Sequence, residues 1–121
     1  MPPETHRDFG STFGPHGCVE QLPSCVVEEF RMWPQLILEK LADALVVFVE
    51  AQLAAGADAI QIFDTWGGLL SPDDYREFSL DYLWKVVSLV KRNGAPLIVF
   101  SKGANACLED ISGIDADVVG L

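Results

Sequence analysis

Residues 59–74 have the sequence AIQIFDTWGGLLSPDD, in which a short apolar run leads through two glycines to the start of a helix. The apolar run has the length and composition of a buried strand. Ser71 is a typical N-cap, and Pro72 fits the first helical position. The two aspartates that follow favour the positive end of the helix dipole. We therefore expect a strand, a glycine-rich turn and a helix, in that order.

The same alternation continues on both sides of this stretch. After Trp33-Pro34, apolar residues recur every three or four positions, which predicts a helix that Gly56 ends as a C-cap. The second helix is expected to run to Arg92, with Asn93-Gly94 as its stop. Beyond it we expect a strand at 96–100, a short helix at 106–111 and a last strand at 118–119. This order implies parallel βαβ units, either in a small doubly wound α/β sheet or in a slice of a (β/α)8 barrel.

The composition limits the possible functions. The chain has 121 residues, enough for one small domain, and 50% of them are apolar with a mean hydropathy of +0.24. Its 18 acidic and 8 basic residues give a net charge of −10, which disfavours binding to nucleic acid or anionic lipid. No apolar run reaches the roughly 18 residues of a membrane helix, and no secretory or transit sequence is visible. We therefore expect a soluble cytoplasmic protein.

Residues 1–29 differ from the rest of the chain. They are rich in proline and lack a lasting periodicity, so we expect an irregular segment ahead of an α/β domain at 30–121. His16, Cys18 and Cys25 are three potential soft metal ligands, but zinc sites usually have four ligands in closer pairs. Three cysteines in the chain are also too few for a disulfide scaffold. We expect inert thiols and no metal site.

The best candidate site lies at the end of the first predicted strand. The loops that follow parallel strands gather at one edge of the sheet, the usual ligand site of both architectures, and Asp64, Thr65 and Trp66 would project there. Asp64 could instead cap nearby backbone amides, and Trp66 could be a core or rim aromatic residue. Neither a nucleotide-binding glycine loop nor a nucleophile elbow is present, and His6 and His16 have no triad partners at a recognisable spacing.

Six motifs carry a family resemblance. They are LEKLAD at 38–43, AQ at 51–52 with AGA at 55–57, QIFDTWGGLLSP at 61–72, YREFS at 75–79, VFSKG at 99–103 and DVVGL at 117–121. Together they resemble the uroporphyrinogen decarboxylase family of haem and chlorophyll biosynthesis, over residues 30–121. The string FDTWGG is specific rather than generic.

The resemblance implies a partial (β/α)8 TIM barrel of roughly three βα units, and in the family a cytoplasmic homodimer. It also implies a lyase that removes four acetate carboxylates from uroporphyrinogen III to give coproporphyrinogen III, without a metal or an organic cofactor. Thr65 occupies the family position whose hydroxyl contacts the substrate, and Phe63 the position of an apolar wall of the cleft. Thr65 and Phe63 are therefore the expected substrate-binding residues.

The same resemblance assigns no catalytic residue to this chain. In the family, the substrate-binding arginines and the catalytic aspartate come from the first barrel strands and a histidine from the last, and this chain contains none of these strands. A family tyrosine expected upstream of residue 30 has no match, because Tyr75 and Tyr82 lie on the second predicted helix. Asp64 is not assigned the catalytic role. We expect this chain alone not to be a competent decarboxylase.

Two other interpretations remain open. The chain stops at Gly120-Leu121 directly after a predicted strand, which suggests a truncated, non-catalytic product. A sister group of the superfamily transfers methyl groups from corrinoid carriers to thiols and uses zinc, held by a His-x-Cys pair after a barrel strand. The corresponding strand end here has the sequence FSKG at 100–103, without a His or Cys ligand, which favours the decarboxylase branch.

Overall fold

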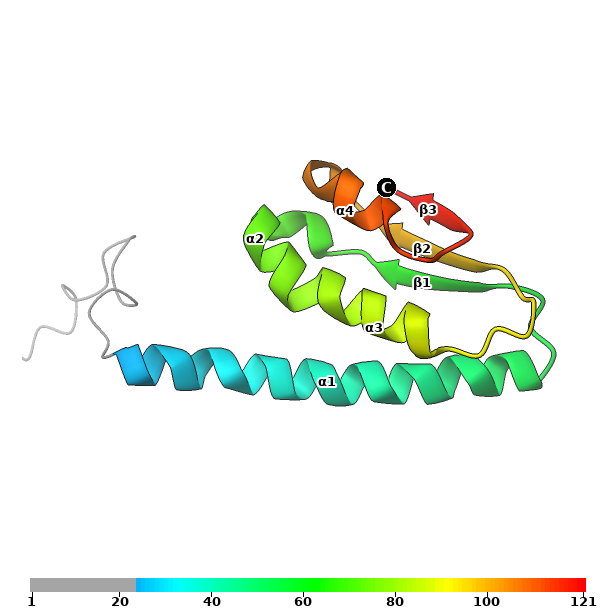
Figure 1. Ribbon diagram of the computed structural model, residues 1–121, viewed down its shortest axis with the longest axis horizontal. Coiled ribbons are helices and arrows are strands. Elements are labelled where there is room, and N and C mark those ends of the chain that lie inside the picture. Colours follow the sequence, from blue (N-terminus) through cyan, green and yellow to red (C-terminus); the bar gives the residue numbers. More distant parts are fainter. Residues whose placement is uncertain (1–23) are drawn as a thin grey trace, which may run out of the picture. The chain divides into compact units, whose positions relative to one another are not determined.

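The computed structural model describes the backbone of residues 24–121 and the side chains from residue 32 onward (Figure 1). The chain divides into two compact units between Trp33 and Pro34, and the sheet belongs to the second unit, residues 34–121. The sequence-based expectations for His6, His16 and Cys18 lie outside the described residues, as does the expectation for the Cys25 thiol.

The first helix, α1, is longer than the sequence predicts. It spans Ser24–Ala54 and contains Pro34 in its interior. The predicted start after Pro34 rests on the apolar periodicity that begins there, and it is wrong, as is the irregular structure expected for residues 24–29. The helix continues through the proline at the cost of a main-chain hydrogen bond. The predicted end is confirmed, because Gly56 has a φ of 103° and Ala57 N donates to Gln52 O at 3.1 Å.

Three parallel strands form a sheet in the order β1-β2-β3 (Figure 1). β1 spans Ile60–Asp64, β2 spans Leu97–Ser101 and β3 spans Val118–Gly120, so every predicted strand is confirmed with bounds shifted by at most one residue. The register pairs Phe63 with Phe100 and Asp64 with Ser101. The ends of β1 and β2 therefore lie side by side, as parallel βαβ units require.

The segment between β1 and β2 begins as predicted. A 3-10 turn at Gly67–Leu69 leads to α2 at Pro72–Tyr75, a π-helical turn at Arg76–Leu80 and α3 at Asp81–Leu89. The predicted N-cap is confirmed, since Ser71 Oγ accepts a hydrogen bond from Asp74 N at 3.2 Å.

The predicted end of this helical segment at Arg92 is wrong. Val90 is already extended, with a φ of −64° and a ψ of 124°. Lys91 N donates at 3.0 Å to Glu50 Oε1 of α1, so this amide finds its acceptor on another helix and needs no further helical turn. Asn93 and Gly94 form a turn with positive φ values of 51° and 89°. After β2, a 3-10 turn at Asn105–Cys107 and α4 at Leu108–Ser112 match the predicted short helix.

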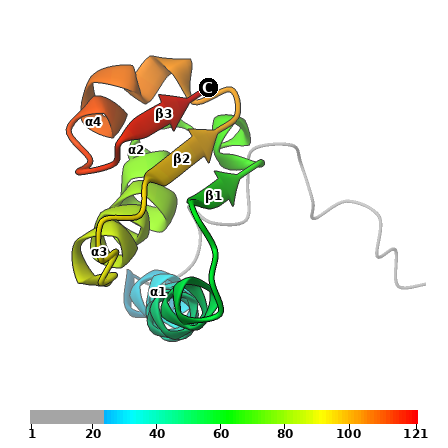
Figure 2. The ribbon, with the colours of Figure 1, turned by 90° about the vertical axis from the view of Figure 1, so that its right-hand side faces the viewer.

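The helices cover one face of the sheet. Figure 2 shows α1 and α3 on the same side of the strands. The core on that side consists of buried apolar residues from the strands, from α1, from α3 and from the α4 region, including Ile62, Val99, Val49, Val86 and Ile111. On the other face, Gln61, Phe63 and Val118 are exposed. No helix in the described part of the chain is long and apolar enough to cross a membrane.

Candidate functional site

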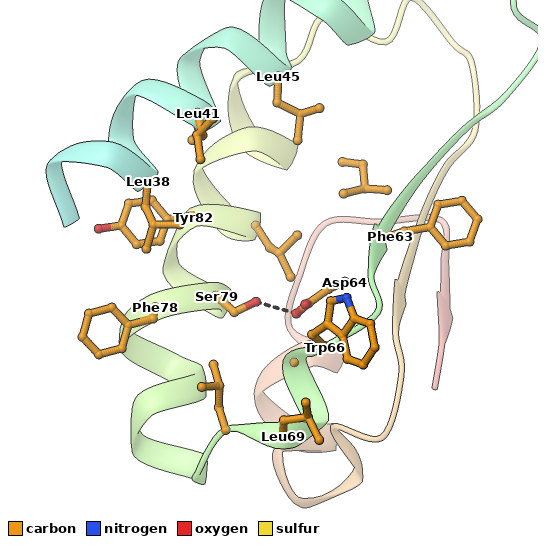
Figure 3. Close-up of a pocket in the computed structure, with 15 residues that line it drawn as sticks. Leu38, Leu41, Leu45, Phe63, Asp64, Trp66, Leu69, Phe78, Ser79 and Tyr82 are labelled. Atoms are coloured by element: carbon orange, nitrogen blue, oxygen red, sulfur yellow. Dashed lines mark hydrogen bonds between the residues drawn. The ribbon is translucent and has the colours of Figure 1, made fainter. Parts of the chain in front are cut away.

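The site predicted from the sequence lies where β1 ends and the glycine turn begins. Phe63 is 66% exposed and Trp66 is 73% exposed, and Thr65 between them is also exposed. The Phe63 ring lies on the opposite side of β1 from the helices (Figure 3). It meets the Phe100 ring of β2 edge to face, with centroids 5.9 Å apart and planes at 66°. Thr65 is thus exposed in the turn, two residues after Phe63, whose ring belongs to an aromatic pair on the uncovered face of the sheet.

Asp64 points the other way, toward the helices (Figure 3). Its Oδ2 accepts hydrogen bonds from Ser79 Oγ at 2.5 Å and from Ser101 Oγ at 3.3 Å. The alternative that Asp64 caps backbone amides is therefore wrong, because its donors are two side-chain hydroxyls. The sequence places Asp64 at a strand end, where a short polar side chain often bonds to the local backbone. In the structure, the π turn and β2 bring the two hydroxyl donors to the carboxylate instead.

Tyr75 extends this group of hydroxyls and was not predicted as a site residue. Tyr75 and Ser101 are buried, and Tyr75 OH lies 2.6 Å from Ser101 Oγ. Ser101 uses its one hydrogen toward Asp64, which as a carboxylate can only accept, so Tyr75 is the donor to Ser101. Burial raises the pKa of the Tyr75 phenol; the hydrogen bond with Ser101 lowers it and the charge of Asp64 raises it. The phenol therefore stays protonated at neutral pH.

The π-helical turn places Ser79 in this network. A π turn contains more residues than an α-helical turn and so changes which side chains face the sheet. Within the turn Arg76–Leu80, Ser79 reaches Asp64, while Glu77 Oε1 accepts a hydrogen bond from Gln35 Nε2 of α1 at 2.9 Å. No local sequence signal marks such a turn. Ser101, in contrast, could have been found from the sequence, because Asp64 and Ser101 each directly follow a predicted strand, and the parallel register pairs them.

Two glycines allow the turn to pass close to this network. A Cβ on Gly67 would lie 2.5 Å from Asp64 Oδ2 and 2.6 Å from Tyr75 Cε2. A Cβ on Gly68 would lie 2.6 Å from the carbonyl oxygen of Lys102. Because each distance is shorter than van der Waals contact, the turn needs glycine at both positions. The predicted glycine-rich turn thus has a steric cause that the structure makes explicit.

A groove of about 460 Å³ lies between α1, β1 and the π turn (Figure 3). Its walls are mostly apolar; Asp64, Ser79 and Tyr82 are the lining residues with carboxylate or hydroxyl groups, and Trp66 also lines the groove. The Phe63 ring points away from it (Figure 3). The groove and the aromatic pair therefore lie on opposite sides of β1.

The described residues hold no group of three or more His, Cys, Asp or Glu side chains that could bind a metal ion. Cys107 is a buried free thiol, and its Sγ lies 3.9 Å from Pro72 O. The polar side chains at the ends of β1 and β2 are therefore hydroxyls, the Asp64 carboxylate and the exposed ammonium of Lys102, which directly follows β2.

Comparison with known proteins shows the family of this chain. The family model for uroporphyrinogen decarboxylase matches residues 19–121. The chain belongs to the uroporphyrinogen decarboxylase family. The match begins at residue 19, ahead of the range 30–121 over which the sequence resembles the family, and it includes all of α1.

Several bacterial uroporphyrinogen decarboxylases are similar to this family member. The protein of Hydrogenovibrio crunogenus is 47% identical over 89 residues, which are 70% of this chain and 25% of that protein. The protein of Pseudomonas syringae is 49% identical over 90 residues, 71% of this chain and 25% of that one. The protein of Magnetococcus marinus is 48% identical over 91 residues, 71% of this chain and 26% of that one. The chain thus matches about a quarter of the length of these relatives.

Proposed function

We propose that residues 30–121 supply one substrate-contacting segment of a uroporphyrinogen decarboxylase, a lyase that converts uroporphyrinogen III to coproporphyrinogen III without a metal or organic cofactor. The family match that covers the turn FDTWGG at the carboxyl end of β1 carries this proposal. Thr65 is the residue whose hydroxyl contacts the substrate. Phe63 forms an apolar wall of the cleft together with Phe100, whose ring it already meets.

The sheet is an arc of a (β/α)8 barrel in this proposal. A doubly wound sheet carries helices on both faces, whereas a barrel carries them only outside. The packing of α1 and α3 on one face and the exposure of Gln61, Phe63 and Val118 on the other support the barrel. The uncovered face corresponds to the barrel interior, and the turn after β1 to the mouth in which substrates of such barrels bind.

The reaction explains why a hydroxyl is useful at Thr65. Loss of CO₂ leaves carbanion character, so the adjacent pyrrole ring first takes a proton and acts as the electron sink. The enzyme holds a carboxylate near the pyrrole N–H groups and places donors for the departing and spectator carboxylates of the substrate. The Thr65 hydroxyl is one such donor, and the aromatic pair is a flat apolar surface for the tetrapyrrole.

The remaining groups of the reaction come from outside the segment in this proposal. In the family, the arginines, the catalytic aspartate, a tyrosine and a histidine come from other parts of the barrel. The chain has a net charge of −10, and the substrate carries eight carboxylates, so electrostatic repulsion opposes binding to this chain alone. We therefore infer that the 121-residue chain is not competent by itself, and that the working enzyme is a cytoplasmic homodimer with a complete barrel. The methyltransferase alternative is not favoured, because β2 ends at Ser101 without a His or Cys ligand.

A chimeric enzyme tests the proposed function. The 89 matched residues of this chain would replace the corresponding segment of the Hydrogenovibrio crunogenus decarboxylase. Coproporphyrinogen formed from uroporphyrinogen is then measured by chromatography, with the parent enzyme and a variant lacking the segment as controls. We expect the turnover of the chimera to be at most about tenfold lower than that of the parent enzyme. This limit corresponds to a loss of ~1.4 kcal/mol in transition-state stabilisation. A folded chimera that forms no coproporphyrinogen would refute the proposed function.

A further inference from the structure

We propose that Asp64 is a positioning residue: its carboxylate, bound by Ser79 and Ser101, holds the turn that presents Thr65 to the substrate. The proposal rests on the proposed function, because the task that it assigns to Asp64 is to support the substrate-contacting residue Thr65. Asp64 does not contact the substrate in this account. It acts through Thr65, its neighbour in the chain.

Four elements meet at the Asp64 carboxylate. Asp64 ends β1, Ser101 ends β2, Ser79 comes from the π turn and Tyr75 from α2. The hydrogen bonds run from Tyr75 to Ser101 and from both serines to Asp64 Oδ2, over 2.6, 3.3 and 2.5 Å. Within the described residues, no buried polar side-chain atom is left without a partner. The network therefore fixes the end of β1 relative to three other elements.

The backbone of the turn is fixed at the same two strand ends. Lys102 N donates to Asp64 O at 3.1 Å, and Gly68 N donates to Lys102 O at 3.2 Å. Gly67, which lies in the chain between Asp64 and Gly68, packs against the Asp64 carboxylate and the Tyr75 ring. Thr65 and Trp66 thus bridge two anchored points, Asp64 and Gly68. A movement of either anchor moves Thr65.

Stability alone does not explain a carboxylate at this place. Removing a carboxylate from water is costly, and hydrogen-bonded charges inside proteins are often replaceable by apolar residues without loss of stability. Asp64 lies half-buried at the edge of an apolar groove, and its hydrogen-bond donors Ser79 and Ser101 are neutral hydroxyls rather than cations. The π turn that delivers Ser79 is also an unfavourable local conformation of a kind often found at functional sites. A role in positioning the turn accounts for both the half-buried carboxylate and the π turn.

A double-mutant cycle in the chimera tests this task. Asp64→Ala and Ser79→Ala each remove one side of the network, and Asp64→Asn keeps one acceptor oxygen as a conservative rescue. We expect Asp64→Ala and Ser79→Ala to lower kcat/KM at least about fivefold when Thr65 is present and less than about twofold in the Thr65→Val background. Asp64→Asn should restore most of the loss. Asp81→Ala, a change of an exposed aspartate at the start of α3, serves as the matched control and should have no effect.

The outcomes separate the two proposals. Equal losses in both Thr65 backgrounds, or no loss from Asp64→Ala in an active chimera, would overturn the positioning role and leave the proposed function intact. If the unmodified chimera is inactive, hydrogen exchange of the 121-residue chain decides the matter. Asp64→Ala should then speed exchange of the Lys102 and Gly68 amides at least about fivefold while Asp81→Ala leaves them unchanged. Unchanged protection of both amides in Asp64→Ala would overturn the positioning role.

Discussion

Asp64 and Thr65 are neighbours in the chain but lie in different surroundings. The Asp64 carboxylate is half-buried and bound by two hydroxyls, whereas Thr65 is exposed. At the end of β1, Asp64 therefore anchors the turn, and its neighbour Thr65 is the residue proposed to contact the substrate. This separation explains why Asp64 was a reasonable site candidate from the sequence although its bonds are internal.

The first prediction concerns Thr65. In the chimera, Thr65→Val keeps the shape of the side chain and removes the hydroxyl, so we expect a loss of roughly 1–3 kcal/mol in transition-state stabilisation, the scale of one hydrogen bond to a charged group. Steady-state kinetics with uroporphyrinogen measures this as a lower kcat/KM. Thr65→Ser, which keeps the hydroxyl, is the matched control. Unchanged kinetics in Thr65→Val would remove Thr65 from the site.

The second prediction concerns Gly68. A Cβ there would lie 2.6 Å from the backbone oxygen of Lys102, and the backbone cannot give way without breaking the turn. We expect Gly68→Ala to lower the free energy of unfolding of the chain by about 1–3 kcal/mol, the usual cost of overpacking.

Denaturant unfolding measures this effect of Gly68→Ala. Gly113→Ala is the control, because Gly113 has a helical φ of −76° and its Cβ would lie 3.3 Å from the Trp84 ring and 3.4 Å from Asp110 O, much farther than the 2.6 Å at Gly68. Equal stability of the two variants would show that the turn tolerates a side chain at residue 68.

At the scale of elements, charges connect the loops at the opposite end of the sheet. Arg92, which follows α3, contacts Asp115 Oδ2 at 3.0 Å and Asp117 Oδ2 at 2.9 Å ahead of β3. Asp117 Oδ2 also accepts a hydrogen bond from Leu97 N at the start of β2, at 2.7 Å. The hydrogen bond from Leu97 lowers the pKa of Asp117, and Arg92 lowers it further. Asp117 thus connects the starts of β2 and β3 in its charged form.

The third prediction follows from this lowered pKa. Asp117 contributes stability above its unfolded pKa of about 3.9, and this stability is lost as the pH falls through the lower folded pKa. We expect the denaturant concentration at the unfolding midpoint to decrease as the pH is lowered through this acidic range. The decrease should be smaller in Asp117→Asn. Asp58→Asn changes an exposed loop aspartate and should retain the full acid dependence. Identical acid dependence of Asp117→Asn and the unmodified chain would contradict the assignment.

The sequence predicts the elements of this fold to different degrees. The strands are confirmed because each is a short apolar run between turn residues, and the start of α2 because Ser71-Pro72 is a local signal. The start of α1 was missed because the apolar periodicity becomes regular only after Pro34, which lies inside the longer helix. The π turn and the end of α3 were missed because both depend on tertiary hydrogen bonds to Asp64 and Glu50.

At the scale of the whole molecule, the sheet has one face covered by helices and one face uncovered. The sequence left a doubly wound sheet and a barrel open, because periodicity does not tell on which side a helix packs. The structure places α1 and α3 on the same side and leaves Phe63 and Val118 exposed on the other. This arrangement, and the match to about a quarter of the length of the relatives, support the arc of a barrel. The substrate roles of Thr65 and Phe63 stay predictions.

The most direct test of the whole account is a side-by-side decarboxylation assay of the 121-residue chain and of the chimera. The substrate is uroporphyrinogen, and coproporphyrinogen is measured by chromatography. We expect turnover by the chimera and none by the chain alone, because the segment supplies Thr65 but not the arginines and the catalytic aspartate that the family uses. Turnover by the chain alone, or none by a folded chimera, would contradict it.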